Sequence, residues 1–229
     1  MGLRYTLAAM KVTIDGPAGS GKSTAARGLA RELGIAYLDT GATYRAATLR
    51  AMRHGVGLSD EQALARCAAQ ADIRLTPEDG GVRVLLDGQD VSEAIREPDV
   101  TDTVHHLANS PAVREVLVAL QRRVGEQFGS FVTEGRDQGT VVFPDADLRV
   151  FLEAAPEVRA MRRYEELLAR GRDADYMDVL RKIIERDGRD RTRSVGPLVK
   201  PRGALHIDSS DLSPEQVVRE ILRHLEQQA

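Results

Sequence analysis

The sequence predicts an α/β protein in which helices cover both faces of a parallel sheet. Three observations carry this prediction. Short apolar runs alternate with helical segments along most of the chain. A glycine-rich sequence at residues 16–23 lies between the first apolar run and the first helix. Residues 73–86 instead alternate apolar and polar side chains, as antiparallel strands do, and so predict a small β insert.

Composition excludes several classes of protein. The 229 residues are 42% hydrophobic and 29% charged with a net charge of −3, which excludes disordered, collagen-like and coiled-coil chains. A chain of this length buries roughly 70% of its extended surface on folding, so its core needs no disulfide or metal. The isoelectric point of about 6.0 gives no basic field for nucleic acid, so we expect no nucleic-acid partner. A single cysteine, Cys67, and the lack of an apolar run near the ~20 residues of a membrane span predict a cytoplasmic protein without membrane contact.

The first half of the chain predicts two strand-and-helix units followed by the insert. Its expected elements are, in chain order, a buried strand at 12–14, an Ala-rich helix at 22–33, a short strand at 36–38, a helix at 42–54 and a helix from 59 through 70. The last of these helices begins at a capping box, SDEQ at 59–62. Antiparallel strands follow at 73–76 and 82–86, with turns at 78–81 and 87–88.

The second half returns to the alternation of strands and helices. Its expected elements are, in chain order, a helical stretch from Asp99, a helix from 110 to about 128, strands at 131–134 and 148–152, a helix from Pro156 that Gly171 ends, a basic helix from about Tyr176 toward Asp190, a strand at 205–207 and a final helix after 213. Ser110 before Pro111 is typical of an N-cap with proline at the first helical position. The sequence SPEQ at 213–216 predicts a capping box, and residues 141–143 fit either a strand or a loop. We expect residues 1–9 to carry no chemistry.

The sequence GPAGSGKS at 16–23 matches the phosphate-loop pattern GxxxxGK(S/T) in full. Its glycines let backbone N–H groups point inward around phosphate oxygens, and the helix that follows adds its partial positive charge. Lys22 is placed to bridge the transferring phosphates, and the Ser23 hydroxyl to bind Mg²⁺. A tight turn with an incidental lysine is the alternative, but the flanking strand and helix favour a nucleotide site.

Two further polar clusters follow predicted strands, at the carboxyl end of the sheet where ligands bind in such folds. Thr40 and Arg45 follow the second strand, where Arg45 could hold a second phosphate. A helix-capping Thr40 and a solvated Arg45 fit this segment equally well. The sequence EGRDQGT at 134–140 places ionisable groups between glycines after the third strand of the sheet. An anion clamp is favoured there over a buried Arg–Asp pair that only holds a loop.

The densest charge of the chain lies between residues 181 and 193. Its basic members are Arg181, Lys182, Arg186, Arg189, Arg191 and Arg193. In a helix, Arg186, Asp190 and Arg193 would share one face, since they are spaced by four and three residues. A solvated, salt-bridged helix is one interpretation. The other is a hinged lid that brings arginines to the phosphates during phosphoryl transfer, with its hinge near Gly196.

The chain offers no nucleophile or zinc constellation. The five histidines, His54, His105, His106, His206 and His224, lack zinc-ligand spacing, and Cys67 has no catalytic sequence context. An acceptor that is already an anionic phosphate needs no general base, so this absence favours a nucleotide acceptor over an alcohol.

Taken together, the motifs resemble those of the bacterial cytidylate kinases, a family of nucleoside monophosphate kinases, almost from end to end. The resemblance rests on IDGPAGSGKST at 14–24, YLDTGATYRA at 37–46, DGQDVSEAIR at 87–96, VRE at 113–115, EGRDQGTVVFPDAD at 134–147, ERDGRDRTR at 185–193 and PLV at 197–199. It implies a monomeric enzyme that transfers the γ-phosphoryl group of ATP to CMP or dCMP with Mg²⁺, giving ADP and the diphosphate.

The same resemblance implies a division of the chain. Residues 1–229 would form one kinase unit with a five-stranded parallel core at 11–39, 107–175 and 194–229. Residues 40–106 would bind the monophosphate and carry the β insert at about 71–96, and residues from about 176 to 193 would form a short Arg-rich lid.

The resemblance also implies roles for single residues. ATP would be bound by Gly16, Pro17, Ala18, Gly19, Ser20, Gly21, Lys22, Ser23 and Thr24, with Ser23 on Mg²⁺ partly through water. CMP would be bound by Thr40, Arg45, His105, Arg114, Arg136, Asp137, Arg186, Asp190 and Arg193. Of these residues, Arg114 and Asp137 resemble cytosine readers, and Arg186 with Asp190 the pair that contacts the sugar. Lys22, Arg136, Arg186 and Arg193 would be the catalytic cations.

Two residues depart from the pattern of the family. His105 stands where a serine is expected nine residues before Arg114, and Gly188 occupies a position of ERDxRD that is often acidic. These departures bear on ribose preference and lid flexibility. Two alternative functions remain open. One is a different kinase with a small acceptor, namely UMP, AMP, shikimate or dephospho-coenzyme A. The other is a nucleotide-dependent switch or binding module.

Overall fold

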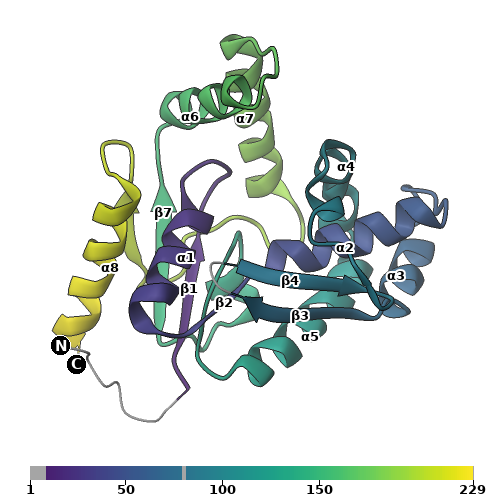
Figure 1. Cartoon of the computed structure of the whole chain (residues 1–229), viewed down its shortest axis with the longest axis horizontal. Coiled ribbons are helices and arrows are strands. Elements are labelled where there is room, and N and C mark those ends of the chain that lie inside the picture. Colours follow the sequence, from purple (N-terminus) through teal and green to yellow (C-terminus); the bar gives the residue numbers. More distant parts are fainter. Residues whose placement is uncertain (1–8, 79–80, 229) are drawn as a thin grey trace.

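The computed structural model describes residues 9–78 and 81–228. Its main sheet has five parallel strands in the order β2-β6-β1-β7-β8 (Figure 1). They are β1 (Lys11–Asp15), β2 (Ala36–Leu38), β6 (Phe131–Gly135), β7 (Leu148–Glu153) and β8 (Leu205–Asp208). Because all five strands are parallel, their carboxyl ends meet at one edge, and the segments that follow them are brought together there.

Helices pack around this sheet, as the alternation of apolar runs and helical segments predicts. They are α1 (Lys22–Leu33), α2 (Thr40–Arg53), α3 (Glu61–Ala69), α4 (Pro98–Asn109), α5 (Pro111–Phe128), α6 (Pro156–Ala169), α7 (Tyr176–Thr192) and α8 (Pro214–Gln228). Helices α1 and α8 pack closely, because a Cβ on Gly28 would lie 3.0 Å from Val218. None of the described helices is long and apolar enough to cross a bilayer.

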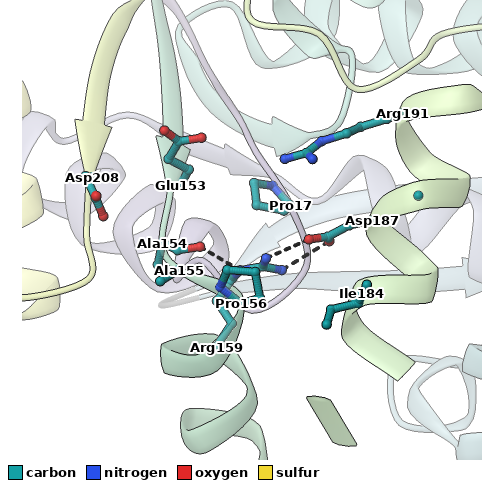
Figure 2. A pocket seen from close by; sticks show the side chains of 11 residues that line it. Pro17, Glu153, Ala154, Ala155, Pro156, Arg159, Ile184, Asp187, Arg191 and Asp208 are labelled. Carbon is teal, nitrogen blue, oxygen red and sulfur yellow. Dashed lines mark hydrogen bonds and ion pairs between the residues drawn. The ribbon is translucent and has the colours of Figure 1, made fainter. Parts of the chain in front are cut away.

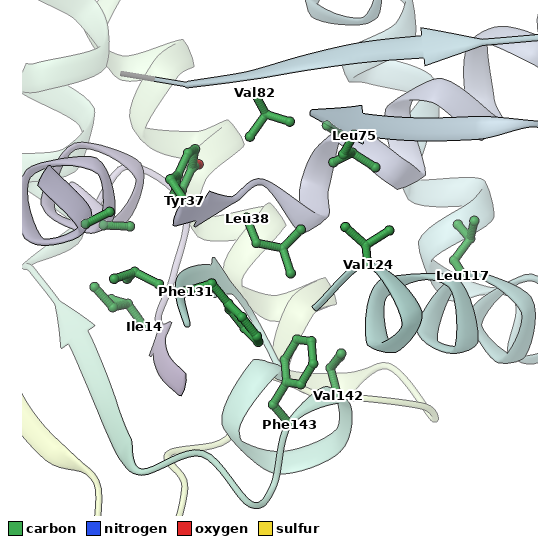
Figure 3. Close-up of a cluster of buried hydrophobic side chains, with 14 of the residues drawn as sticks. Ile14, Tyr37, Leu38, Leu75, Val82, Leu117, Val124, Phe131, Val142 and Phe143 are labelled. Carbon is green, nitrogen blue, oxygen red and sulfur yellow. The ribbon is translucent and has the colours of Figure 1, made fainter. Parts of the chain in front are cut away.

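The insert is a three-stranded antiparallel sheet of β3 (Ile73–Glu78), β4 (Gly81–Leu86) and β5 (Gln89–Asp90). The two-residue strand β5 adds to the two strands predicted. Alternate side chains of the insert, among them Leu75 and Val82, are buried in the main core near Leu38 of β2 and Val124 of α5 (Figure 3). The insert is therefore part of the main core rather than a separate lobe.

Helices α6 and α7 rise away from the sheet (Figure 1). They pack on each other around a small apolar cluster of Ala160, Val179 and Ile183, which is separate from the main core. Few apolar contacts therefore fix α7 to the rest of the molecule, as the lid interpretation requires.

Most element predictions are confirmed, and the differences have local causes. Helix α2 begins at Thr40 rather than at residue 42, because Asp39 is its N-cap and accepts a hydrogen bond from the Ala42 N–H (2.9 Å). Thr40 is thus not the cap. Helix α3 is capped by Asp60 rather than Ser59, since the Asp60 carboxylate accepts from the Ala63 N–H.

Residues 141–143, predicted as a strand or a loop, instead lie at the end of a π-helical turn, Gln138–Val142. The N-cap at Ser110 and the reciprocal capping box between Ser213 and Gln216 are confirmed. Residues 1–8 and the centre of the turn predicted at 78–81 lie outside the described residues.

Candidate active site

The phosphate loop joins β1 to α1 at the carboxyl edge of the sheet. Gly19 and Gly21 have φ angles of 77° and 87°, which L side chains rarely adopt, so the loop conformation depends on glycine. Gly21 is also the N-cap of α1, and no side chain caps that end of the helix. The first N–H groups of α1 are thus left for an anion, as the motif predicts.

Beside the loop lie an ammonium group, a hydroxyl group and a carboxylate. Lys22 is 5% exposed, and its Nζ donates to the Pro17 carbonyl (2.6 Å). Burial, followed by the positive charges of Arg136 and Arg186, lowers the pKa of Lys22 to about 7. Three cations therefore lie close together here. The negative charge of polyphosphate oxygens would neutralise their positive charge.

Ser23 donates from its Oγ to Oε1 of Glu134 (2.7 Å), at the end of β6. Partial burial raises the pKa of Glu134, but the charge of Lys22 and the hydrogen bond from Ser23 outweigh it and hold that pKa below its usual range. Glu134 is therefore a carboxylate at neutral pH. Glu134 belongs to the predicted cluster at 134–140, but the sequence analysis gave it no role of its own. Its place at the end of a buried strand could have indicated that it belongs to the site.

A second polar centre lies at the same edge of the sheet. Arg114 from α5 and Asp137 from the loop after β6 form an ion pair in which both residues are at most 5% exposed. Arg193, at the end of α7, approaches the other oxygen of Asp137 (3.5 Å). Residues predicted from three separate segments thus meet at one carboxylate.

Gly196 covers this pair. Its φ is 56°, its carbonyl accepts a hydrogen bond from Arg193 Nε, and a Cβ at this position would overlap Arg114 and Asp137. The turn after α7 is therefore packed directly against the Arg114–Asp137 pair, and only glycine fits there.

Arg136 links the loop after β6 to α7. Its Nε donates to Oδ2 of Asp190 (2.7 Å), and both side chains are less than one-fifth exposed. Arg186 lies on α7 one turn before Asp190 and is exposed to solvent. The predicted lid residues thus already contact the predicted anion clamp.

Thr40 and Arg45, which the sequence predicts as acceptor-site groups, each have a partner within the protein. Thr40 donates from its Oγ1 to the Glu134 carbonyl (2.9 Å), and Arg45 donates to Asp39 (2.9 Å). Arg45 Nε and Arg114 Nε are buried and have no hydrogen-bond partner among the described residues, and Arg193 Nη2 has only its 3.5 Å contact with Asp137 there. Buried guanidinium donors without partners are costly, so their presence in this region indicates an anionic or carbonyl-bearing ligand.

His105 is not brought to this centre by any described contact. It lies on α4, where its Nδ1 is 2.7 Å from the Asp102 carbonyl and its ring stacks near that of His106. Gly188 lies within α7 with open space around its Cα.

Asp15 was missed by the sequence analysis. Its carboxylate is fully buried and accepts hydrogen bonds from the N–H groups of Gln138 (2.8 Å) and Gly139 (2.7 Å). Burial raises its pKa to about 6, against the effect of these two hydrogen bonds. Asp15 thus ties the end of β1, just before the phosphate loop, to the segment that follows Asp137.

A pocket of about 460 Å³ opens beside Pro17 of the phosphate loop (Figure 2). Its walls are the ends of β7 and β8, the start of α6 and one face of α7, and they include Glu153, Asp208 and Arg191. The pocket thus adjoins the phosphate loop and offers both acidic and basic groups to a polar ligand.

Comparison with known proteins identifies the family of this chain. The family model for cytidylate kinase matches residues 12–227. A cytidylate kinase of Pelotomaculum thermopropionicum is 52% identical over 92% of this chain and 93% of its own length, and one of Caldanaerobacter subterraneus is 48% identical over 93% and 92%. A gluconokinase structure from Sinorhizobium meliloti matches 96% of this chain and 94% of its own with a TM-score of 0.52 at 16% identity, which speaks for the fold alone. The chain belongs to the cytidylate kinase family.

Proposed function

We propose that the protein transfers the γ-phosphoryl group of ATP to CMP or dCMP, giving ADP and CDP or dCDP. The observation that carries this proposal is the convergence of Lys22, Arg136 and Arg186 between the phosphate loop and the buried Arg114–Asp137 pair. A donor polyphosphate on one side and an acceptor phosphate on the other would bring negative charge to these cations. Membership of the cytidylate kinase family supports the same assignment.

On the donor side, residues 16–24 hold the ATP phosphates through backbone N–H groups and Lys22. Ser23 and Glu134 fit a magnesium ion, because a hydroxyl oxygen and an ionised carboxylate oxygen lie 2.7 Å apart there. In nucleotide sites Mg²⁺ is usually bound by one or two protein oxygens together with phosphate oxygens. Bound there, the metal would neutralise charge on the donor phosphates. The 460 Å³ pocket beside Pro17 provides space for the nucleoside of ATP.

The transfer step needs charge stabilisation rather than a general base, because the attacking group is already a phosphate oxygen. Arg136, Arg186 and Arg193 would surround the transferred group, and Lys22 would follow it from donor to acceptor. Asp190 holds Arg136 in place for this role (2.7 Å).

Cytosine would be read by Arg114 and Asp137. A carboxylate only accepts hydrogen bonds, so Asp137 would favour the exocyclic amine of cytosine over the carbonyl of uracil. Thr40 and Arg45 complete the acceptor side, with Arg186 and Asp190 near the sugar. His105 would contact the base or the sugar when α4 approaches the bound ligand.

We further propose that the protein acts as a cytoplasmic monomer. Residues 40–106 would then bind the monophosphate as one region, and residues from about 176 to 193 would close as a lid. The apolar cluster through which α7 packs on α6 is small and separate from the main core, which supports a lid that can move relative to that core.

A coupled assay of ADP release tests the reaction. Mg-ATP is supplied with CMP, dCMP, UMP, AMP, shikimate or dephospho-coenzyme A at matched concentration. Turnover is expected with CMP and dCMP far above the other acceptors. Turnover with another acceptor alone would overturn the assignment within the kinase class, and ATP binding without any turnover would revive the switch interpretation.

A further inference from the structure

Arg159 of α6 is part of the wall of the pocket beside Pro17, but no role has been assigned above to its side chain. It is 2% exposed and among the largest fully buried side chains of the protein. Its Nε donates to the Ala154 carbonyl (2.8 Å), and its Nη1 donates to the Ala18 carbonyl in the phosphate loop (3.0 Å). Both terminal nitrogens also bind the carboxylate of Asp187 on α7, at 3.1 and 2.6 Å (Figure 2). One guanidinium thus joins β7, the phosphate loop and the proposed lid.

The contact with Ala18 fixes the direction of a peptide group. In a trans peptide the N–H points opposite to the C=O, and no described peptide bond is cis. Because the Ala18 carbonyl is held toward Arg159, the N–H of Gly19 is turned away from it. Gly19 is also packed against this side chain, since a Cβ on Gly19 would lie 3.3 Å from the Cβ of Arg159. A phosphate loop needs its N–H groups directed at the ligand, and Arg159 sets that direction for one of them.

The contact with Asp187 fixes the middle of α7. The buried residues of this helix are Val179, Ile183 and Asp187, and of these only Asp187 is polar. Asp187 directly follows Arg186 and precedes Asp190 by three residues, so the ion pair holds the turn that carries both. The remaining apolar contacts of α7 are the small cluster with α6.

An apolar side chain of similar volume would fill this space without reproducing these bonds. Lysine would not reproduce them either, because its ammonium lacks the planar fork that binds a carboxylate through two nitrogens while also reaching a carbonyl. The arrangement therefore depends on a guanidinium in particular.

We propose that Arg159 is a positioning residue for the donor nucleotide: through Ala18 it sets the phosphate-loop conformation that binds ATP, and through Asp187 it holds Arg186 over that loop. This inference rests on the proposed function for its catalytic part. Its donor-binding part concerns ATP alone and does not depend on the identity of the acceptor.

The test separates donor binding from acceptor use. The dissociation constant of Mg-ATP is measured by calorimetry without acceptor, and kcat and KM for CMP are measured at saturating ATP. Arg159→Met is expected to weaken ATP binding at least about tenfold, ~1.4 kcal/mol, while KM for CMP changes less than about twofold. Asp187→Asn, which keeps the Ala18 contact, is expected to lower kcat more than it weakens ATP binding. Arg159→Lys is expected to resemble Arg159→Met.

Arg223→Met is the matched control. Arg223 lies on α8 and pairs with Glu220, but the two side chains are 60% and 44% exposed, so ATP affinity and kcat should stay within about twofold of the wild type. A melting temperature is recorded for each variant, and if Arg159→Met does not fold, Arg159→Lys and Asp187→Asn carry the test.

Folded variants with a lowered melting temperature but wild-type ATP affinity and kcat would overturn the proposal, since that pattern is the one a purely structural ion pair gives. If the wild-type protein does not turn over CMP, the proposed function fails, whereas the ATP-binding comparison still decides the role of Arg159.

Discussion

The donor and acceptor sides of the site are built in opposite ways. The donor side is a continuous run, residues 16–24, whose geometry comes from glycine φ angles and the uncapped end of α1. The acceptor side collects single side chains from α5, α7 and the loop after β6, held by ion pairs across the fold. The donor side is therefore determined mainly by one contiguous segment, to which Arg159 adds a contact from α6, whereas the acceptor side exists only when distant segments are correctly packed.

This difference predicts which properties of the enzyme can be changed separately. A substitution on the acceptor side should alter the use of CMP and leave ATP binding intact, provided that its side chain does not face the phosphate loop. Lys22 and Arg136 lie where the two sides meet, since the charge of Arg136 affects the pKa of Lys22. Substitutions of Lys22 and Arg136 therefore test most directly whether the donor side and the acceptor side can be changed separately.

The largest effect is expected for Lys22→Ala. It removes the buried ammonium that would follow the transferred phosphoryl group, so kcat should fall by roughly a thousandfold or more. The measurement is ADP release at saturating ATP and CMP, with the melting temperature as a check on folding. Near-normal turnover would remove Lys22 from the mechanism.

The next largest effect is expected for Arg136→Met. It removes a cation from the transfer region and the ion pair with Asp190, so kcat/KM for CMP should fall by roughly 10²–10³-fold. The dissociation constant of ATP should change less than about threefold. An equal loss in ATP affinity would show that the two sides are not separable at this residue.

A smaller effect is expected for Gly196→Ala. The added Cβ would overlap Arg114 and Asp137, so KM for CMP should rise by about tenfold, which corresponds to about 1.4 kcal/mol. Gly203→Ala is the control, because Gly203 also has a left-handed φ of 71° but open space around its Cα. Equal effects of the two substitutions would assign the loss to backbone conformation and not to the covered ion pair.

The smallest effect concerns pH. Lys22 has a pKa of about 7 in the ligand-free protein because of burial and nearby positive charge, and ATP phosphates favour its protonated form. Binding must therefore take up a proton above pH 7, and ATP affinity should fall by about fivefold between pH 7 and pH 8. Calorimetry across this range measures it. Lys22→Arg, whose guanidinium stays charged, should flatten the profile, and a flat wild-type profile would contradict the assignment.

The comparison also explains what the sequence could predict. The phosphate loop was predicted in full, because a contiguous motif between a strand and a helix specifies its own geometry. Local patterns placed Asp137 in an anion clamp and Arg193 in an arginine-rich lid, but the reading of cytosine by Arg114 and Asp137 came only from the family resemblance. That they meet at one carboxylate depends on the packing of α5, α7 and β6.

Arg159 and Asp187 were missed for the same reason. Each belongs to a charge-rich helix in which most charged side chains are exposed to solvent. The sequence of neither helix shows which of its charged side chains is buried. Helix starts were misplaced by one or two residues where Asp39 and Asp60 act as caps in place of neighbouring hydroxyl residues.

The most direct test of the site is a competition between CMP and UMP for wild-type protein and Asp137→Asn. Asp137 is the carboxylate at which the acceptor side converges, and an amide there both donates and accepts hydrogen bonds. The ratio of kcat/KM for CMP to that for UMP should fall at least about tenfold in Asp137→Asn and stay unchanged in Asp178→Asn, whose carboxylate is 55% exposed on α7. An unchanged ratio in an active Asp137→Asn protein would contradict the reading of cytosine by this carboxylate.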